Sequence, residues 1–202
     1  MARPLVLACG ALVTELRAVF AANDLTDALD VHYLPANLHN RPERIVPALR
    51  MLIGEHVVDD PDRPVLLGYA DCGTGGHIDA LIAEMPQVQR LPGAHCYEFF
   101  AGAHVFAELH DDQPGTFYLT DFLAKHFDAL VWHGLGLDRH PELRPMYFGN
   151  YTRVVLLSQG TDEALVGAGR VAADRLGLEF EHRHVGLEPF GSAVTVSLRR
   201  AA

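Results

Sequence analysis

The sequence predicts a single α/β domain over residues 1–202, built in three layers from a mostly parallel sheet with helices on both faces. Three observations support this. Short apolar runs alternate with segments of helical periodicity along the whole chain, which is typical of parallel sheets. Apolar residues make up 49% of the 202 residues, enough for a sizeable core. No segment has the length and composition of a linker between two domains.

Each strand is expected where a short apolar or alternating run is bounded by turn residues. The runs that meet this condition are 5–8, 28–34, 64–67, 88–91, 116–119, 153–157 and 178–184, with 194–198 as a further edge strand.

Helices are expected where apolar residues recur every three or four positions. The first follows Cys9-Gly10, and the second enters at Asn40, a potential N-cap with Glu43 three residues later. The remaining segments with this periodicity are 78–85, 96–109, 121–130 and 162–176.

The charge balance excludes some partners. The formal net charge is −10 and lysines and arginines do not cluster, which argues against a nucleic-acid backbone or an anionic membrane as partner. No apolar run approaches the roughly 18–20 residues that span a bilayer. The apolar start of the chain is too short for a signal peptide and is interpreted as a first strand, so we expect a cytoplasmic protein.

A glycine-rich turn at residues 68–77 is the most informative stretch. It follows an apolar run and precedes a helical pattern, as where a buried strand leads into a helix. Cys72 lies in this turn, Cys9 ends the first expected strand, and Cys96 opens a helix. In a parallel sheet all three would lie at the carboxyl edge, where open α/β sheets bind ligands. The alternative is that they are small buried apolar residues.

An odd number of widely spaced cysteines argues against a disulfide framework and favours metal ligation or reactive thiols. A helix N-terminus should lower the pKa of a thiol, which favours the thiolate. Three thiolates would suit Zn²⁺ with an open fourth position, or an iron–sulfur cluster with one open iron, and zinc is slightly preferred. His95 or His77 could be a fourth ligand or a proton donor. A metal-free thiol enzyme that uses Cys72 alone is a further alternative.

Other side chains in these turns suit supporting roles. His95, Glu98 and Asp71 are candidates for proton transfer or for orienting a ligand, although the two carboxylates could equally cap helices. The backbone of Gly73, Thr74, Gly75 and Gly76 could approach a sulfur atom or an anionic substrate closely. Its spacing lacks a nucleotide-binding signature.

The aromatic segment at residues 145–151 suggests a packed cap or a contact between two copies in a homodimer.

In several stretches, among them the three that carry the cysteines, the chain resembles a prokaryotic family catalogued as domain of unknown function 1638. The matching stretches are 8–12, 34–35, 38–42, 71–76, 95–98, 118–123 and 147–151. Ala70 departs from the pattern, which has glycine before the Asp-Cys-Gly of the turn. The resemblance implies an association with corrinoid and one-carbon methyl metabolism.

We therefore expect a metal-dependent protein with ligands Cys9, Cys72 and Cys96. It would be an enzyme acting on a small polar or methylated substrate, with a corrinoid protein or methyltransferase as a possible partner. The alternative is a non-catalytic accessory protein that carries a metal or a methylated cofactor.

Overall fold

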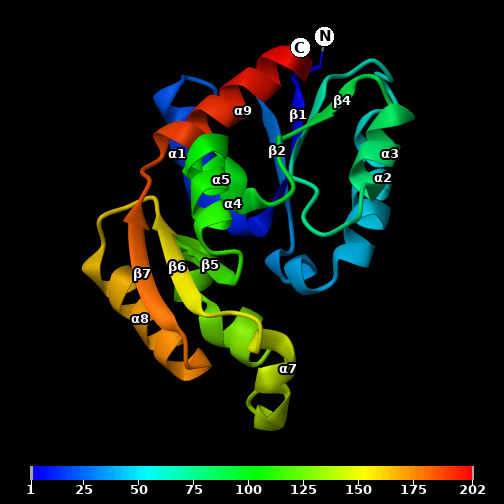
Figure 1. Cartoon of the computed structure of the whole chain (residues 1–202). Helices are drawn as coiled ribbons and strands as arrows, with labels where there is room; N and C mark the ends of the chain where they lie inside the picture. Colours follow the sequence, from blue (N-terminus) through cyan, green and yellow to red (C-terminus); the bar gives the residue numbers. More distant parts are fainter. Residues whose placement is uncertain (1, 202) are drawn as a thin grey trace. The chain divides into compact units, whose positions relative to one another are not determined.

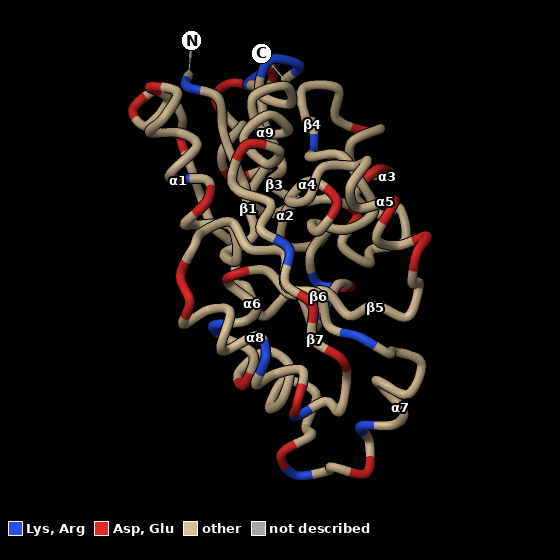
Figure 2. The backbone as a smooth tube through the Cα atoms, turned by 60° about the vertical axis from the view of Figure 1, so that its left-hand side comes forward, with Lys and Arg blue, Asp and Glu red and all other residues tan. Residues whose placement is uncertain are grey.

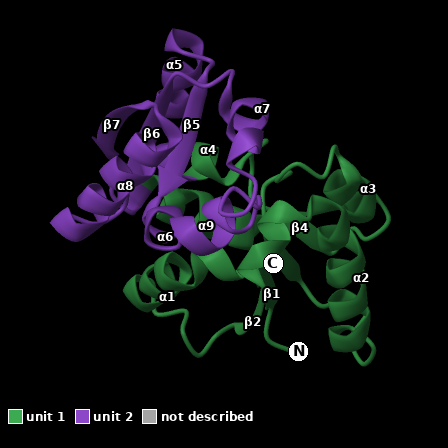
Figure 3. Ribbon diagram, turned by 90° about the horizontal axis from the view of Figure 1, so that it is seen from below, with its two compact units in different colours: residues 1–99, 189–202 green, residues 100–188 purple. Residues whose placement is uncertain are grey.

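The computed structural model describes residues 2–201 and confirms the α/β class. All paired strands run parallel, and they are divided between two sheets. The chain forms two compact units (Figure 3): unit 1 runs to Phe99 and resumes at Pro189, and unit 2 covers residues 100–188. The expectation of parallel strands alternating with helices is therefore met, although the sequence did not reveal that they form two sheets.

Unit 1 contains a four-stranded sheet in the order β2-β1-β3-β4. Its strands are β1 (Leu5–Cys9), β2 (Asp30–Leu34), β3 (Val65–Gly68) and β4 (Val88–Arg90). The central strands β1 and β3 are almost fully apolar and buried, as expected for a sheet covered on both faces.

Helices cover both faces of this sheet (Figure 1). They are α1 (Val13–Ala22), α2 (Ile45–His56), α3 (His77–Ala83), α4 (Cys96–Ala101), whose last residues belong to unit 2, and α9 (Glu188–Ala201). Leu5 and Leu7 share a buried cluster with residues of α2 and α3. The neighbouring β1 residue, Ala8, points the opposite way, toward Gly68 and the α1 residue Leu16. The three expected layers are therefore present within unit 1.

Unit 2 contains a three-stranded sheet in the order β5-β6-β7. Its strands are β5 (Thr116–Thr120), β6 (Arg153–Ser158) and β7 (Glu179–His184), and its helices are α5 (Ala103–Asp112), α6 (Asp121–Lys125), α7 (Arg144–Phe148) and α8 (Glu163–Leu176). Gly169 of α8 allows close packing on Phe180 and Leu156, because a Cβ there would lie 3.0 and 3.2 Å from their side chains. Helix α8 therefore covers the sheet face that carries these two residues.

Several shorter turns complete the two units. They are the 3₁₀ turns Gly10–Leu12, Ala36–Asn40, Pro42–Arg44 and Pro141–Leu143, and the π turn Asp128–Trp132. The expected helix at residues 121–130 is thus a short α-helix followed by a π turn. In the aromatic segment, α7 buries Phe148 and leaves Met146 and Tyr147 exposed.

The edge strand expected at residues 194–198 is wrong, because these residues belong to helix α9. The buried positions Phe190, Val194 and Ser197 are four and three residues apart, which is the spacing of one helix face. The alternation of Val194, Val196 and Leu198 imitates a strand, but Val196 is 46% exposed.

Acidic and basic residues are dispersed over both units rather than gathered by sign (Figure 2). Within residues 2–201, none of the helices combines the length and the apolar character needed to cross a membrane.

Candidate functional site

Cys9 ends β1, where the chain turns directly into the 3₁₀ turn before α1. The turn requires a glycine at position 10, because a Cβ there would lie 2.8 Å from the carbonyl oxygen of Leu34 and 3.3 Å from the nitrogen of Ala36. The carboxyl ends of the paired strands β1 and β2 are thus held close together, and Cys9 pairs there with Leu34.

Cys72 lies in the loop after β3, in a left-handed backbone conformation with φ of 51°. A residue with a side chain pays about 1–2 kcal/mol for this conformation. Neighbouring Gly73, Gly75 and Gly76 also have positive φ, without such a cost. The loop therefore holds one strained residue, and that residue is a cysteine. Strain of this kind concentrates at functional sites.

The carboxylate of Asp71 organises this loop. It accepts hydrogen bonds from the Thr74 hydroxyl at 2.8 Å, from Gly75 N at 3.1 Å and from Gly76 N at 2.8 Å. The amides of Gly75 and Gly76 are therefore engaged by Asp71, whereas we had expected the glycine-rich backbone to face a sulfur atom or an anionic substrate. The geometry gives Asp71 a positioning role.

Cys96 begins α4, and the turn before it is bonded to the Cys72 loop. Asp71 N donates to Gly93 O at 3.1 Å, and Cys72 N donates to Ala94 O at 3.0 Å. Glu98 caps the same turn, because its Oε2 accepts from Ala94 N at 3.0 Å. Two separate segments are thus joined just where each carries its cysteine.

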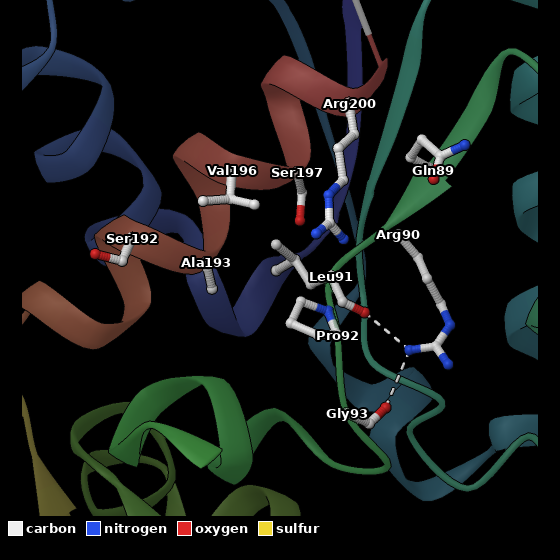
Figure 4. Close-up of a pocket in the computed structure, with 10 residues that line it drawn as sticks. All are labelled: Gln89, Arg90, Leu91, Pro92, Gly93, Ser192, Ala193, Val196, Ser197 and Arg200. Carbon is white, nitrogen blue, oxygen red and sulfur yellow. Dashed lines mark hydrogen bonds between the residues drawn. The ribbon is translucent and has the colours of Figure 1, made fainter. Parts of the chain in front are cut away.

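Arg90 fixes this turn from the β4 side (Figure 4). Its Nη1 donates to the carbonyl oxygens of Leu91 at 2.8 Å and Gly93 at 3.0 Å, while Asp79 binds the other two nitrogens at 2.6 and 3.0 Å. Residues 89–93 also form one wall of a cavity of about 620 Å³, and α9 forms the other. The guanidinium of Arg90 therefore stabilises the turn through four of its five N–H donors.

The three cysteines, which we call the thiol cluster, lie close enough together to influence one another's ionisation. Burial, followed by repulsion from Cys9, raises the pKa of Cys72 to about 12. Burial, followed by repulsion from the other two thiols, raises the pKa of Cys96 well above its usual value. Burial also raises the pKa of Cys9. These pKa values are raised, contrary to the expectation that a helix N-terminus would lower them, and burial is the largest cause for each thiol.

Tyr69 belongs to the site and was missed from the sequence. Its hydroxyl is buried and interacts with the thiol of Cys9. Burial, then repulsion from Cys9 and Cys72, raises its pKa. Its position at the end of the apolar run made it resemble a core residue.

The sequence-predicted histidines lie at the surface. His77 begins α3 and is exposed, and His95 is exposed in the turn before Cys96. His95 is close to His39, which the sequence analysis did not single out. Desolvation lowers the pKa of His39, and repulsion from His95 lowers it further. His39 therefore lies within electrostatic range of the turn that precedes Cys96.

The thiol cluster offers sulfur donors, which suit a soft metal ion. These donors are not arranged around a common centre that would hold an ion. All three cysteines are free thiols. Within residues 2–201, no group of three or more His, Cys, Asp or Glu side chains is arranged to hold a metal ion. Each thiol can turn about a single side-chain torsion, so the positions of the sulfur atoms are adjustable.

The loop carboxylates make unit 1 sensitive to acid. Burial acts to raise the pKa of Asp71, but the hydrogen bonds from Thr74, Gly76 and Gly75 and the charge of Arg90 lower it overall. The hydrogen bond from Arg90 lowers the pKa of Asp79. Depressed folded-state pKa values stabilise the fold above the unfolded value of about 4, and this stabilisation is lost as the pH falls through the folded values.

We therefore expect the free energy of unfolding to fall more steeply between about pH 5 and pH 3 in the natural protein than in an Asp71→Asn variant. Urea unfolding followed by circular dichroism at several pH values measures this difference. Equal slopes for the two proteins would contradict the role assigned to Asp71.

No curated protein and no solved structure matches the chain. A family model does match, under the description "Protein of unknown function (DUF1638)", over residues 33–194. This match spans most of the 202 residues and includes Cys72 and Cys96. The chain belongs to the family of proteins of unknown function DUF1638.

Proposed function

We propose that the protein is metal-dependent and binds one transition-metal ion through Cys9, Cys72 and Cys96. The observation that carries this proposal is the meeting of three thiols from three separate segments at the carboxyl end of one parallel sheet. Open α/β sheets bind their ligands at this edge.

The electrostatics of the thiol cluster support a cation rather than a free nucleophile. Because burial and repulsion from Cys9 raise the pKa of Cys72, its thiolate is scarce at neutral pH. A metal ion reverses this balance, since a coordinating thiol loses its proton outright. The repulsion that now disfavours several thiolates would then be offset by their attraction to the ion.

Zinc is the preferred ion. Three protein ligands leave a fourth position of its tetrahedral shell for substrate, which is the pattern of catalytic zinc sites. An iron–sulfur cluster with one open iron remains the alternative. When bound, the ion would supply Lewis-acid activation.

The chain's own residues have defined tasks in this proposal. Asp71 and Glu98 hold the two loops, His95 moves protons, and Tyr69 orients the thiol of Cys9 through its hydroxyl. We propose an enzyme that acts on a small polar or methylated substrate in one-carbon metabolism linked to corrinoid proteins. The free cysteines support a cytoplasmic location.

The test is elemental analysis of protein purified without oxygen, with the Cys9→Ser, Cys72→Ser and Cys96→Ser variants beside it. We expect close to one equivalent of metal in the natural protein and roughly a hundredfold weaker binding in each variant, because serine is a poor ligand for these ions. Far-ultraviolet circular dichroism checks that each variant is folded. Unchanged metal content in all three variants would eliminate the shared site.

The second proposed function is that of a metal carrier. The open arrangement of the thiols supports this function. Loaded protein mixed with a strong chelator distinguishes the two. Release within seconds would indicate a carrier, whereas retention for hours would indicate the resident metal of an enzyme.

A further inference from the structure

A second group of side chains lies at the carboxyl end of the other sheet, within unit 2. His182 and His184 are two residues apart on β7, so both project from the same face of the strand. Phe180 shares this face and packs against α8. Both histidines are exposed, and both line a cavity of about 470 Å³ with Gly160, Thr161, Glu163 and Val166.

One buried hydroxyl orients both rings. Ser158, at the end of β6, is 2% exposed. Its Oγ lies 2.8 Å from Nε2 of His182 and 3.3 Å from Nδ1 of His184. Because both contacts are made to one atom, the two rings are neighbours, and the ring nitrogens that stay free for a ligand are Nδ1 of His182 and Nε2 of His184. Both rings are therefore held at a common point.

A backbone carbonyl sets the tautomer of one ring. Nδ1 of His184 lies 3.1 Å from Gly160 O, which can only accept a hydrogen bond, so Nδ1 carries the proton and Nε2 keeps its lone pair. Histidines that bind metals usually have this arrangement, with the far nitrogen bonded to a carbonyl or another acceptor. Gly160 is itself fixed, since its N–H donates to Asp121 at 3.0 Å.

The surrounding charges favour a cation. Glu163 contributes a carboxylate to the cavity wall. The arginine between the two histidines, Arg183, belongs to the opposite side of the strand and pairs with Glu181 at 2.6 Å. The nearest basic residue in sequence is therefore directed away from the rings and is neutralised.

We propose that His182 and His184 together bind one divalent transition-metal ion, such as Zn²⁺, Ni²⁺ or Co²⁺, at the mouth of this cavity. Imidazole nitrogens suit these ions, and water completes the coordination shell. Glu163 adds negative potential without acting as a ligand, which agrees with the finding that no group of three ligating side chains exists within residues 2–201. Ser158 is a positioning residue that holds the rings in place.

Cobalt titration tests this site and separates it from the thiol cluster. Cobalt bound by thiolates absorbs strongly in the near ultraviolet, whereas cobalt bound by imidazole and water does not. We expect a Cys72→Ser variant to lose the ultraviolet band and to keep one calorimetric binding event. A variant that combines His182→Gln with His184→Gln should keep the ultraviolet band and lose that event.

The matched control is His104→Gln with His110→Gln, which removes two exposed histidines from α5 and should leave binding at β7 unchanged. Ser158→Ala should weaken the β7 event about tenfold or more if the hydroxyl positions the rings. A binding event without the ultraviolet band that persists when His182→Gln and His184→Gln are added to the Cys72→Ser variant would overturn the proposal, whatever the outcome at the cysteines.

Discussion

Replacing Arg153 by methionine is expected to lower the free energy of unfolding of unit 2 by about 3 kcal/mol or more. The side chain of Arg153 is only 9% exposed, and every nitrogen of its guanidinium is bonded. Nη1 binds Glu181 at 2.9 Å and Asp112 at 3.2 Å, Nη2 donates to Leu109 O at 3.0 Å, and Nε donates to Thr116 at 2.8 Å. Methionine fills the volume but leaves these acceptors without their donor.

The matched control is Arg183→Met, because Arg183 pairs with the same carboxylate at 2.6 Å but is 57% exposed. A surface pair of this kind contributes at most about 1 kcal/mol. The chain has a single tryptophan, Trp132 in unit 2, so its fluorescence during urea unfolding reports on this unit. Equal losses for the two variants would show that burial of Arg153 does not set its contribution.

Local patterns were sufficient to predict most of the secondary structure. Each buried strand is a short apolar run bounded by turn residues, and six of the expected runs coincide closely with β1, β3, β4, β5, β6 and β7. The assignment to two sheets was not predictable in this way, because pairing depends on contacts between residues distant in sequence. The strand predicted in the C-terminal segment was wrong for a related reason. Over so short a window, the residues from Val194 to Leu198 satisfy the periodicity of a strand and that of a helix.

The location of the thiol cluster followed from topology, whereas its electrostatics did not. Cys9 and Cys72 follow strands that pair in parallel, so their convergence could be inferred from the fold class. The direction of the pKa shifts depends on burial and on distances between sulfur atoms, and neither can be read from the sequence. The left-handed backbone of Cys72 could not be predicted either, because glycine is the residue that normally indicates such a conformation in a sequence.

The histidine pair on β7 did leave a signal that the sequence analysis overlooked. His182-Arg183-His184 alternates along an expected strand, so both rings had to share one face. The sequence could not show that Ser158, at the end of β6, contacts both rings.

Replacing Gly68 by alanine is expected to destabilise unit 1 by about 3 kcal/mol, the upper end of the usual cost of overpacking. Gly68 pairs with Ala8 across the central strands β3 and β1. A Cβ at position 68 would lie 2.5 Å from the Cβ and 3.0 Å from the Cα of Ala8. Relief requires movement of the β1 backbone, which is packed on both sides, so the strain cannot be removed by a change of rotamer.

The control is Gly54→Ala in α2, where an added Cβ meets nothing within 4 Å. There the same change should stabilise the helix by about 0.5–1 kcal/mol, because alanine loses less backbone entropy than glycine. Urea unfolding followed by far-ultraviolet circular dichroism measures both variants. Since Ala8 precedes Cys9 and Gly68 precedes Tyr69, separating the strands also displaces the thiol cluster, so Gly68→Ala should bind the proposed metal more weakly while Gly54→Ala should not. Stability and metal affinity unchanged by Gly68→Ala would mean that β1 and β3 do not approach as closely as their register indicates.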